Sequence, residues 1–179
     1  MRIKWFSLIR ITGLLLVLLY HFFQTIFPGG FFGVDVFFTF SGFLITALLI
    51  EEFSKNHEIN LIGFFRRRFY RIVPPVVLMV LVTMPFTFLV RQDYVAGIGG
   101  QIAGVLGFMT NFYELLTGGS YESQFIPHLF VHNWSLAVEV HYYILWGLAV
   151  WFLSKQAKSN GPLTGMVFLM YLIQISEPT

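Results

Sequence analysis

Two ionisable residues near the start of the chain have the types and the spacing needed for proton transfer. Arg10 and His21 are eleven residues apart, and residues 11–34 contain no Asp, Glu, Lys or Arg. Eleven residues return a helix to within about 20° of the same face, roughly 16 Å further along its axis. Ionisable side chains within apolar spans are often functional. The spacing therefore predicts a functional stripe, while an interfacial Arg10 and a packed His21 explain the sequence equally well.

A carboxylate follows on the next apolar segment. The turn Phe27-Pro28-Gly29-Gly30 is so short that it predicts an antiparallel helix hairpin, which would bring His21 and Asp35 to similar depths. If Asp35 accepts the Nδ1 proton of His21, the other ring nitrogen can take a proton from an alcohol. The pair can equally be structural, because losing either partner would leave an unpaired polar group in lipid.

A basic cluster lies beyond the polar loop at 51–60. Its members are Arg66, Arg67, Arg68 and Arg71. Guanidinium groups bind phosphate through paired hydrogen bonds, which suits a polyanionic ligand. Attraction to anionic lipid is the competing explanation and, on charge alone, the more frequent one. Pro74-Pro75 predicts a break between this segment, expected at the membrane surface, and the next span.

A second polar group opens a later apolar segment. Ser135, Glu139 and either Tyr142 or Tyr143 follow helical spacing just after Trp134, so their side chains are expected on one face. Glu139 could pair with an arginine, hold a substrate hydroxyl or serve as a structural anchor. His128 and His132 have the i, i+4 spacing of metal ligands, but no H-E-x-x-H pattern is present, and we expect no metal.

The elements that must hold these residues are membrane helices. The 179 residues are 56% apolar and 11% charged, which is too little polar surface for a soluble globule, and the absence of Cys excludes thiol chemistry. The net charge of +2 indicates no nucleic-acid partner. We predict an all-α, polytopic transmembrane bundle of five or six segments in a single membrane domain, residues 1–179. The expected helices are 5–27, 31–50, 72–90, 97–116, 135–153 and 163–176.

The positive-inside rule places the N-terminus and the basic cluster in the cytoplasm, two crossings apart. The first helix is not expected to be a cleaved signal peptide, because no small-residue cleavage site follows it. Strict alternation would put Lys155 and Lys158 outside, so the 97–116 segment is either a span or re-entrant. Gly100 and Gly104, in a G-x-x-x-G pattern there, indicate close helix packing.

Together these residues resemble the N-terminal part of the acyltransferase-3 family of bacterial membrane O-acetyltransferases, which act on peptidoglycan or O-antigen. Arg10 and His21 match the family's R-x10-H pattern, and residues 33–45 resemble its second helix. Residues 68–74 resemble its R-x-x-R-I-x-P motif, and Trp134-Ser135-Leu136 with Glu139 and Tyr143 resembles its W-S-L-x-x-E-x-x-x-Y motif.

The resemblance implies transfer of an acyl group, usually acetyl, from cytoplasmic acyl-CoA to a carbohydrate hydroxyl across the bacterial inner membrane. It implies that His21 is the catalytic base or acyl carrier beside Arg10, and that Arg68 and Arg71 face the CoA phosphates. Glu139 and Trp134, with Ser135 and Tyr143, would shape the acceptor side. Relatives continue to about ten helices, so a C-terminal half or partner domain is expected to be missing here.

Two other classes of protein fit the same residues. In a transporter or channel subunit, Arg10, His21, Asp35 and Glu139 would line a proton or solute path. A non-catalytic truncated remnant of the acyltransferase would keep the motifs without the activity. Solute flux in the absence of acetyl-CoA would select the first, and failure to bind CoA or glycan would select the second.

Overall fold

The computed structural model describes residues 4–23, 25–89, 95–117 and 128–156, and within these ranges the chain forms helices and no strand. The predicted all-α fold is confirmed. The elements are α1 (Lys4–Phe22), η1 (Pro28–Phe31), α2 (Phe32–Asn56), α3 (Leu61–Thr83), η2 (Met84–Leu89), α4 (Ile98–Leu106), α5 (Thr110–Thr117), η4 (Val131–Asn133) and α6 (Trp134–Gln156). They belong to two compact units, residues 1–59 with 149–179 and residues 60–148.

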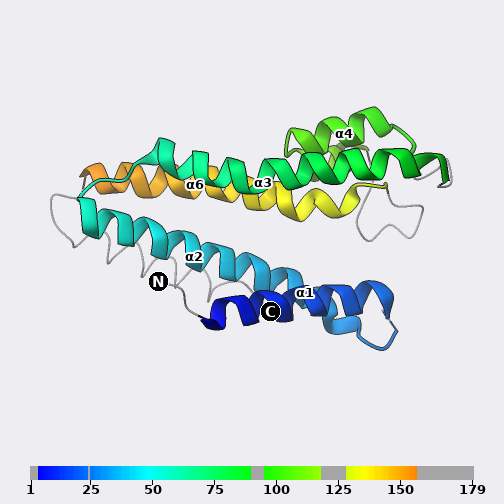
Figure 1. Cartoon of the computed structure of the whole chain (residues 1–179), viewed down its shortest axis with the longest axis horizontal. Coiled ribbons are helices and arrows are strands. Elements are labelled where there is room, and N and C mark those ends of the chain that lie inside the picture. Colours follow the sequence, from blue (N-terminus) through cyan, green and yellow to red (C-terminus); the bar gives the residue numbers. More distant parts are fainter. Residues whose placement is uncertain (1–3, 24, 90–94, 118–127, 157–179) are drawn as a thin grey trace. The chain divides into compact units, whose positions relative to one another are not determined.

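The first unit contains the predicted hairpin of α1 and α2, which lie side by side (Figure 1). Glycines allow the two helices to approach closely. A Cβ atom on Gly30 would lie 2.4 Å from the main-chain oxygen of Leu16, and one on Gly33 would lie 2.6 Å from that of Gly13. Because any larger residue would clash with main chain, these glycines fix the distance between the helices.

The second helix extends past its predicted end at residue 50. Lys55 Nζ lies 2.5 Å from Glu51 Oε1 one turn earlier, a pairing that supports a helix. The helix ends at His57, which adopts a left-handed conformation with φ of 54° and donates its N–H to the Phe53 carbonyl. The polar composition of 51–56 was therefore that of an exposed helix end, not of a loop.

The predicted break at Pro74-Pro75 is wrong, because α3 continues through both prolines. Each proline removes one main-chain hydrogen bond, but packing on both sides compensates. Phe64 is 2% exposed before the prolines, and after them Val76 and Val80 are each 6% exposed in a cluster with Val105. The basic segment is thus the first half of an apolar helix rather than a separate surface helix.

The predicted helix at 97–116 is two helices, α4 and α5. The chain turns at Phe108, which has a φ of +53°. With nine and eight residues, the helices are about 13 Å and 12 Å long, too short to cross a hydrocarbon core of about 30 Å. This geometry favours the re-entrant alternative. A residue pattern that is apolar throughout could not reveal the turn.

The G-x-x-x-G packing predicted for α4 is confirmed. A Cβ atom on Gly100 would lie 2.7 Å from Cε2 of the Tyr113 ring, and one on Gly104 would lie 3.4 Å from Tyr113 Cβ. The two glycines therefore form the surface against which α5 packs through Tyr113.

We expect Gly100→Ala to destabilise the protein by about 1–3 kcal/mol, because the added methyl group must displace the Tyr113 ring. Thermal unfolding in lipid nanodiscs measures the effect. Gly99→Ala is the matched control, since a Cβ atom there has nothing within 4 Å. The control should be neutral or stabilising by up to about 1 kcal/mol. Equal losses of stability in the two variants would contradict the packing.

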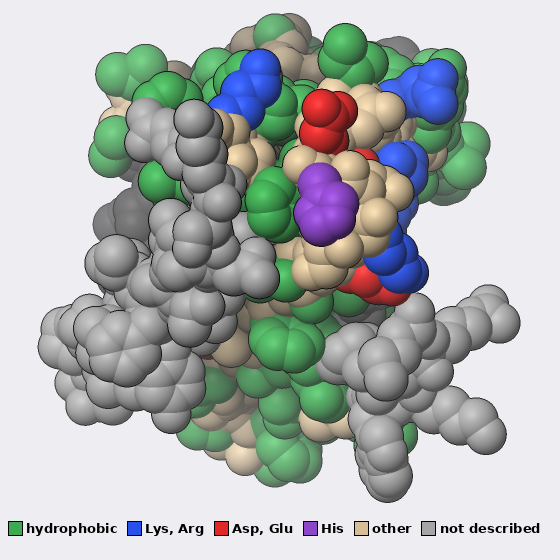
Figure 2. All heavy atoms as spheres, turned by 90° about the vertical axis from the view of Figure 1, so that its left-hand side faces the viewer, with side chains coloured by type: hydrophobic (Ala, Val, Ile, Leu, Met, Phe, Trp, Pro, Cys, Tyr) green, Lys and Arg blue, Asp and Glu red, His purple; other side chains and the backbone are tan. Residues whose placement is uncertain are grey.

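In the part of the chain that the structure describes, three helices are long and apolar enough to cross a membrane: Pro28–Asn56, Leu61–Thr87 and Val131–Lys155. Ile11–Phe22 is a shorter apolar helix. Because several of its helices can span the bilayer, the protein is a multi-pass membrane protein. Acidic, basic and histidine side chains lie among apolar ones on the face shown in Figure 2. The expected helix at 163–176 lies outside the described residues.

Candidate functional site

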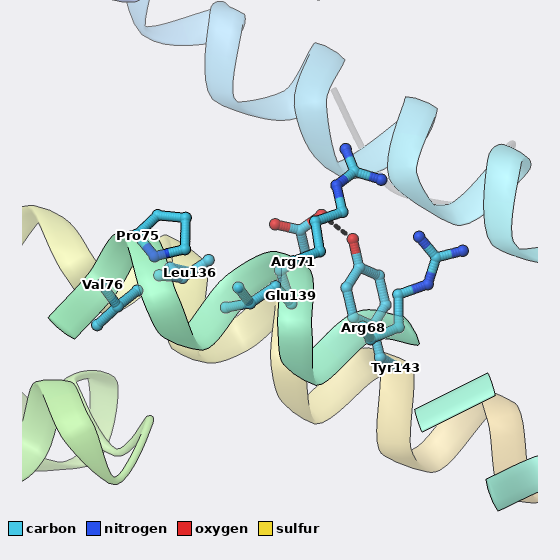
Figure 3. Close-up of a pocket in the computed structure, with 8 residues that line it drawn as sticks. Arg68, Arg71, Pro75, Val76, Leu136, Glu139 and Tyr143 are labelled. Carbon is cyan, nitrogen blue, oxygen red and sulfur yellow. Dashed lines mark hydrogen bonds between the residues drawn. The ribbon is translucent and has the colours of Figure 1, made fainter. Parts of the chain in front are cut away.

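A pocket of about 250 Å³ lies between α3 and α6 in the second unit (Figure 3). Each helix contributes two of its polar side chains. These are two arginines on α3 and a carboxylic acid and a phenol on α6. Its lining consists of Arg68, Arg71, Ile72, Pro75, Val76, Leu136, Glu139 and Tyr143. The sequence predicted the four polar residues as ligand-binding groups, and the structure brings them together.

A close contact holds α3 against α6 beside this pocket. Phe64 of α3 packs on Gly147 of α6, where a Cβ atom would lie 3.0 Å from Cε1 of the ring. Phe64 and Phe65 meet edge to face, with centroids 5.3 Å apart. Because Gly147 has no side chain, the aromatic ring of Phe64 packs directly against α6.

Arg68 is the arginine that the fold partly buries. Its guanidinium carbon lies 5.5 Å from the centre of the Phe64 ring and 5.7 Å from that of Tyr143, so it contacts aromatic rings of both helices. Its Nε atom is buried and has no hydrogen-bond partner among the described residues. An unpaired buried donor is costly, so the site favours a ligand that supplies an acceptor.

Arg71 lines the same pocket from one turn further along α3 and is exposed. Arg66 and Arg67 are exposed and are not among the pocket-lining residues. The structure thus divides the cluster that the sequence showed as one group. Helical spacing of three residues puts the third and fourth arginines of the cluster, Arg68 and Arg71, on the pocket side.

Glu139 and Tyr143 interact as their i, i+4 spacing predicted, because the Tyr143 hydroxyl donates to Oε1 of Glu139 (Figure 3). Ser135 and Trp134, which the sequence grouped with them, are not among the pocket-lining residues. The Ser135 hydroxyl instead donates to the carbonyl of His132 at 3.4 Å. The four residues assigned by resemblance to the acceptor side therefore form two groups. Glu139 and Tyr143 line the same pocket as the arginines, and Trp134 and Ser135 do not.

Tyr143→Phe should destabilise the protein by about 1–3 kcal/mol, because Glu139 loses a buried donor while the ring over Arg68 remains. Tyr143 is 9% exposed, and Tyr70, which is 69% exposed on α3, supplies the control. Tyr70→Phe should change the free energy of unfolding by less than about 0.5 kcal/mol. If the unfolding curves of the two variants coincide, the hydrogen bond from Tyr143 to Glu139 contributes nothing to stability.

The predicted catalytic residues lie on the hairpin of the first unit. His21 is exposed near the end of α1, and its Nδ1 lies 2.8 Å from the carbonyl oxygen of Val17. A carbonyl only accepts, so Nδ1 carries the proton and Nε2 of the neutral ring has the lone pair needed by a base. The Tyr20 ring meets the imidazole edge to face, with centroids 5.5 Å apart.

The predicted hydrogen bond from His21 Nδ1 to Asp35 is therefore wrong. Helical side chains point back toward the N-terminus, so Nδ1 of the imidazole reaches the carbonyl of Val17, four residues earlier on its own helix. Asp35 lies in the first turn of α2 and is exposed. Arg10 lies in α1, and the stripe that it would share with His21 stays a prediction. Catalytic roles for Arg10 and Asp35 stay predictions.

Glu114 is a polar residue that sequence analysis missed. It lies on α5, is 6% exposed and bonds to Nδ1 of His128. The signal was present, because this acid lies near the end of the helix predicted at 97–116. Among the described residues, no group of three His, Cys, Asp or Glu side chains could hold a metal ion.

Comparison with known proteins identifies the family. The sequence model of the acyltransferase-3 family, described as an acyltransferase domain, matches residues 3–176. The chain belongs to this family. The acyltransferase-3 motifs quoted above thus provide the two arginines, the acid and the phenol of the pocket.

Curated acyltransferase relatives are longer proteins. O-acetyltransferase OatA of Staphylococcus aureus (strain NCTC 8325 / PS 47) is 30% identical over 167 residues, which cover 93% of this chain and 28% of OatA. OatA of strain COL matches to the same extent. The strain COL protein SACOL0978 is 33% identical over 136 residues, which cover 76% of this chain and 22% of that protein. The chain thus spans about a quarter of these relatives' length, and no solved structure matches it significantly.

Proposed function

We propose that this chain carries the donor-binding and proton-transfer residues of a membrane O-acyltransferase. The enzyme would move an acyl group, most simply acetyl, from cytoplasmic acyl-CoA to a hydroxyl of an extracytoplasmic cell-envelope carbohydrate such as peptidoglycan or lipopolysaccharide. Family membership and the name O-acetyltransferase given to the relatives support this reaction. The single observation that carries the proposal is the buried, unpaired Nε–H of Arg68 in a pocket that also contains Arg71.

The pocket suits a phosphate group. Arg68 presents a donor without an acceptor, and Arg71 adds a second fixed positive charge one turn away. Arginine forks bind phosphate through two parallel hydrogen bonds, which a lysine cannot reproduce. At about 250 Å³ the pocket is smaller than the roughly 300–1,000 Å³ of sites for whole drug-sized ligands. It would therefore hold a phosphate of CoA, with the rest of the donor outside it.

Glu139 shares this pocket, where its carboxylate would repel an anionic ligand. The hydrogen bond from Tyr143 holds one carboxylate oxygen on α6. We propose that this bond keeps Glu139 turned from the phosphate and that Tyr143 also orients Arg68 through its ring. In this proposal Glu139 and Tyr143 act at the donor end, and Trp134 and Ser135 retain the proposed acceptor role.

His21 would remove the proton from the acceptor hydroxyl through Nε2. The hydroxyl oxygen then forms a bond to the thioester carbon, the carbon–sulfur bond breaks, and the CoA thiolate leaves and takes up a proton. The imidazolium of His21 is the source of that proton, so the step balances without another reactant. The bond from Nδ1 to Val17 supports this role because it fixes the tautomer. A transient acyl group on His21 would serve the same net reaction.

The proposed location is the bacterial cytoplasmic membrane with the N-terminus inside. Arg66, Arg67, Arg68 and Arg71 favour the cytoplasmic side under the positive-inside rule. On that side the pocket would meet CoA where the cell supplies it.

Binding of CoA by the whole chain in nanodiscs tests the proposal. We expect saturable binding by calorimetry, competition by 3′-phosphoadenosine 5′-diphosphate and no competition by pantetheine, because the pocket would take the phosphates. Labelled acetyl-CoA added to membranes should then transfer acetyl to envelope glycan. Absence of CoA binding would overturn the proposal, and solute flux without CoA would favour the transporter alternative.

A further inference from the structure

The second unit contains a buried acid–imidazole pair away from the arginine pocket. Oε2 of Glu114 lies 2.8 Å from Nδ1 of His128, and the two side chains are 7% and 18% exposed. A carboxylate this far from solvent needs a compensating partner. The reaction proposed above makes no use of either residue.

Buried polar atoms of α5 have no hydrogen-bond partner among the described residues. In the described part of the chain, Oε1 of Glu114 and Oγ1 of Thr110 are buried and have no hydrogen-bond partner, as does Oδ1 of Asn111. Thr110 is 1% exposed. Thr110 and Glu114 are four residues apart and so lie on one face of α5. That face of α5 therefore carries two buried oxygens without a hydrogen-bond partner.

Neighbouring contacts tie this part of the second unit to α4. The Tyr113 ring lies 5.6 Å from the His128 ring and packs on Gly100 of α4. Gln101 of α4 accepts the main-chain N–H of Phe130 at 3.3 Å. Both α5 and the segment that contains His128 are therefore anchored to α4.

The missing partner must both donate and accept. An ionised carboxylate oxygen only accepts, whereas the Thr110 hydroxyl also has a proton to donate. An ammonium group would satisfy Glu114 but not the Thr110 proton. A hydroxyl group satisfies both, since it carries one donor and two acceptor sites.

We propose that Thr110 and Glu114 bind a hydroxyl group, which donates to Oε1 of Glu114 and accepts from the Thr110 hydroxyl. His128 orients the carboxylate through its hydrogen bond to Oε2. The ligand enters past His128, the least buried member of the pair. The identification of its source as the carbohydrate acceptor rests on the proposed function, and water offers the same chemistry.

The natural absence of cysteine allows a site-specific test. Thr110→Cys places a lone thiol in the site, and Val105→Cys places one in the apolar cluster of α4, where Val105 is 2% exposed. Both variants of the whole chain are treated in nanodiscs with 2-aminoethyl methanethiosulfonate. A cavity that admits a hydroxyl-bearing ligand also admits the small polar reagent, whereas a thiol packed among apolar groups is shielded from it. Thr110→Cys should therefore react at least about tenfold faster than Val105→Cys. Glu114→Gln in the Thr110→Cys background should reduce this advantage, because the carboxylate attracts the cationic reagent into the site.

Addition of methyl glucoside distinguishes the two sources of the hydroxyl. Slower labelling of Thr110→Cys with the glucoside supports a carbohydrate ligand, and unchanged rapid labelling supports water. Equal, slow labelling of the two variants would overturn the site. Should Thr110→Cys fail to give monodisperse protein, Asn111→Cys replaces it. CoA binding is measured on the same nanodisc samples. If the unmodified chain does not bind CoA, that result counts against the proposed function and not against the hydroxyl site.

Discussion

Replacing Arg68 by lysine should weaken CoA binding by about 10- to 100-fold. The substitution retains the positive charge but removes the buried Nε–H and the planar contacts with Phe64 and Tyr143. A charge-assisted hydrogen bond contributes about 1.5–3 kcal/mol, and each 1.4 kcal/mol corresponds to about tenfold in affinity. Calorimetric titration of the variant in nanodiscs with CoA measures the change.

Arg66→Lys is the matched control, because Arg66 is an exposed arginine of the same helix that does not line the pocket. It should change the dissociation constant by less than about twofold, since exposed charges interact weakly across water. If lysine at both positions reduced affinity equally, nonspecific attraction to the basic segment would explain CoA binding. If neither variant lost affinity, the pocket would not be the donor site.

Removal of the His21 imidazole should reduce acetyl transfer by about 100- to 10,000-fold, the usual contribution of a positioned general base. His21→Ala is assayed with labelled acetyl-CoA in membranes that contain the complete enzyme. Its affinity for CoA should stay unchanged, because the proposed donor pocket consists of α3 and α6 residues. A selective loss of transfer would assign His21 to chemistry rather than to donor binding.

His57→Gln controls for loss of an exposed histidine. His57 ends α2 with a φ of +54°, and glutamine there should retain transfer close to that of the unmodified protein. Transfer by His21→Ala at the unmodified rate would refute the catalytic assignment. Asp35→Asn, measured alongside, tests whether the exposed carboxylate on α2 takes part although Val17 accepts the Nδ1 proton.

Much of the site was predictable because it depends on helical periodicity. The spacing of Arg68 and Arg71, and of Glu139 and Tyr143, places each pair on one helix face whatever the surrounding fold. The α1–α2 hairpin was predictable from Phe27-Pro28-Gly29-Gly30, since so short a connection leaves little choice of arrangement. These features are local, and the sequence carries local information directly.

Features that depend on distant contacts were not predictable. The prolines of α3 normally end or kink a helix, and the packing of Val76 and Val80 against Val105 outweighs that tendency. The hydrogen bond of His21 depends on side-chain direction rather than on depth in the membrane. Glu114 was hidden at the end of an apolar stretch, because only the fold shows that it meets His128.

The short lengths of α4 and α5 have a consequence for biogenesis. Neither helix is long enough to cross the bilayer as an independent span. The pair is instead held by packing, since α4 contacts α3 and α5 packs on the glycines of α4. We therefore expect the translocon to release the longer apolar helices first and the short pair to insert against them afterwards.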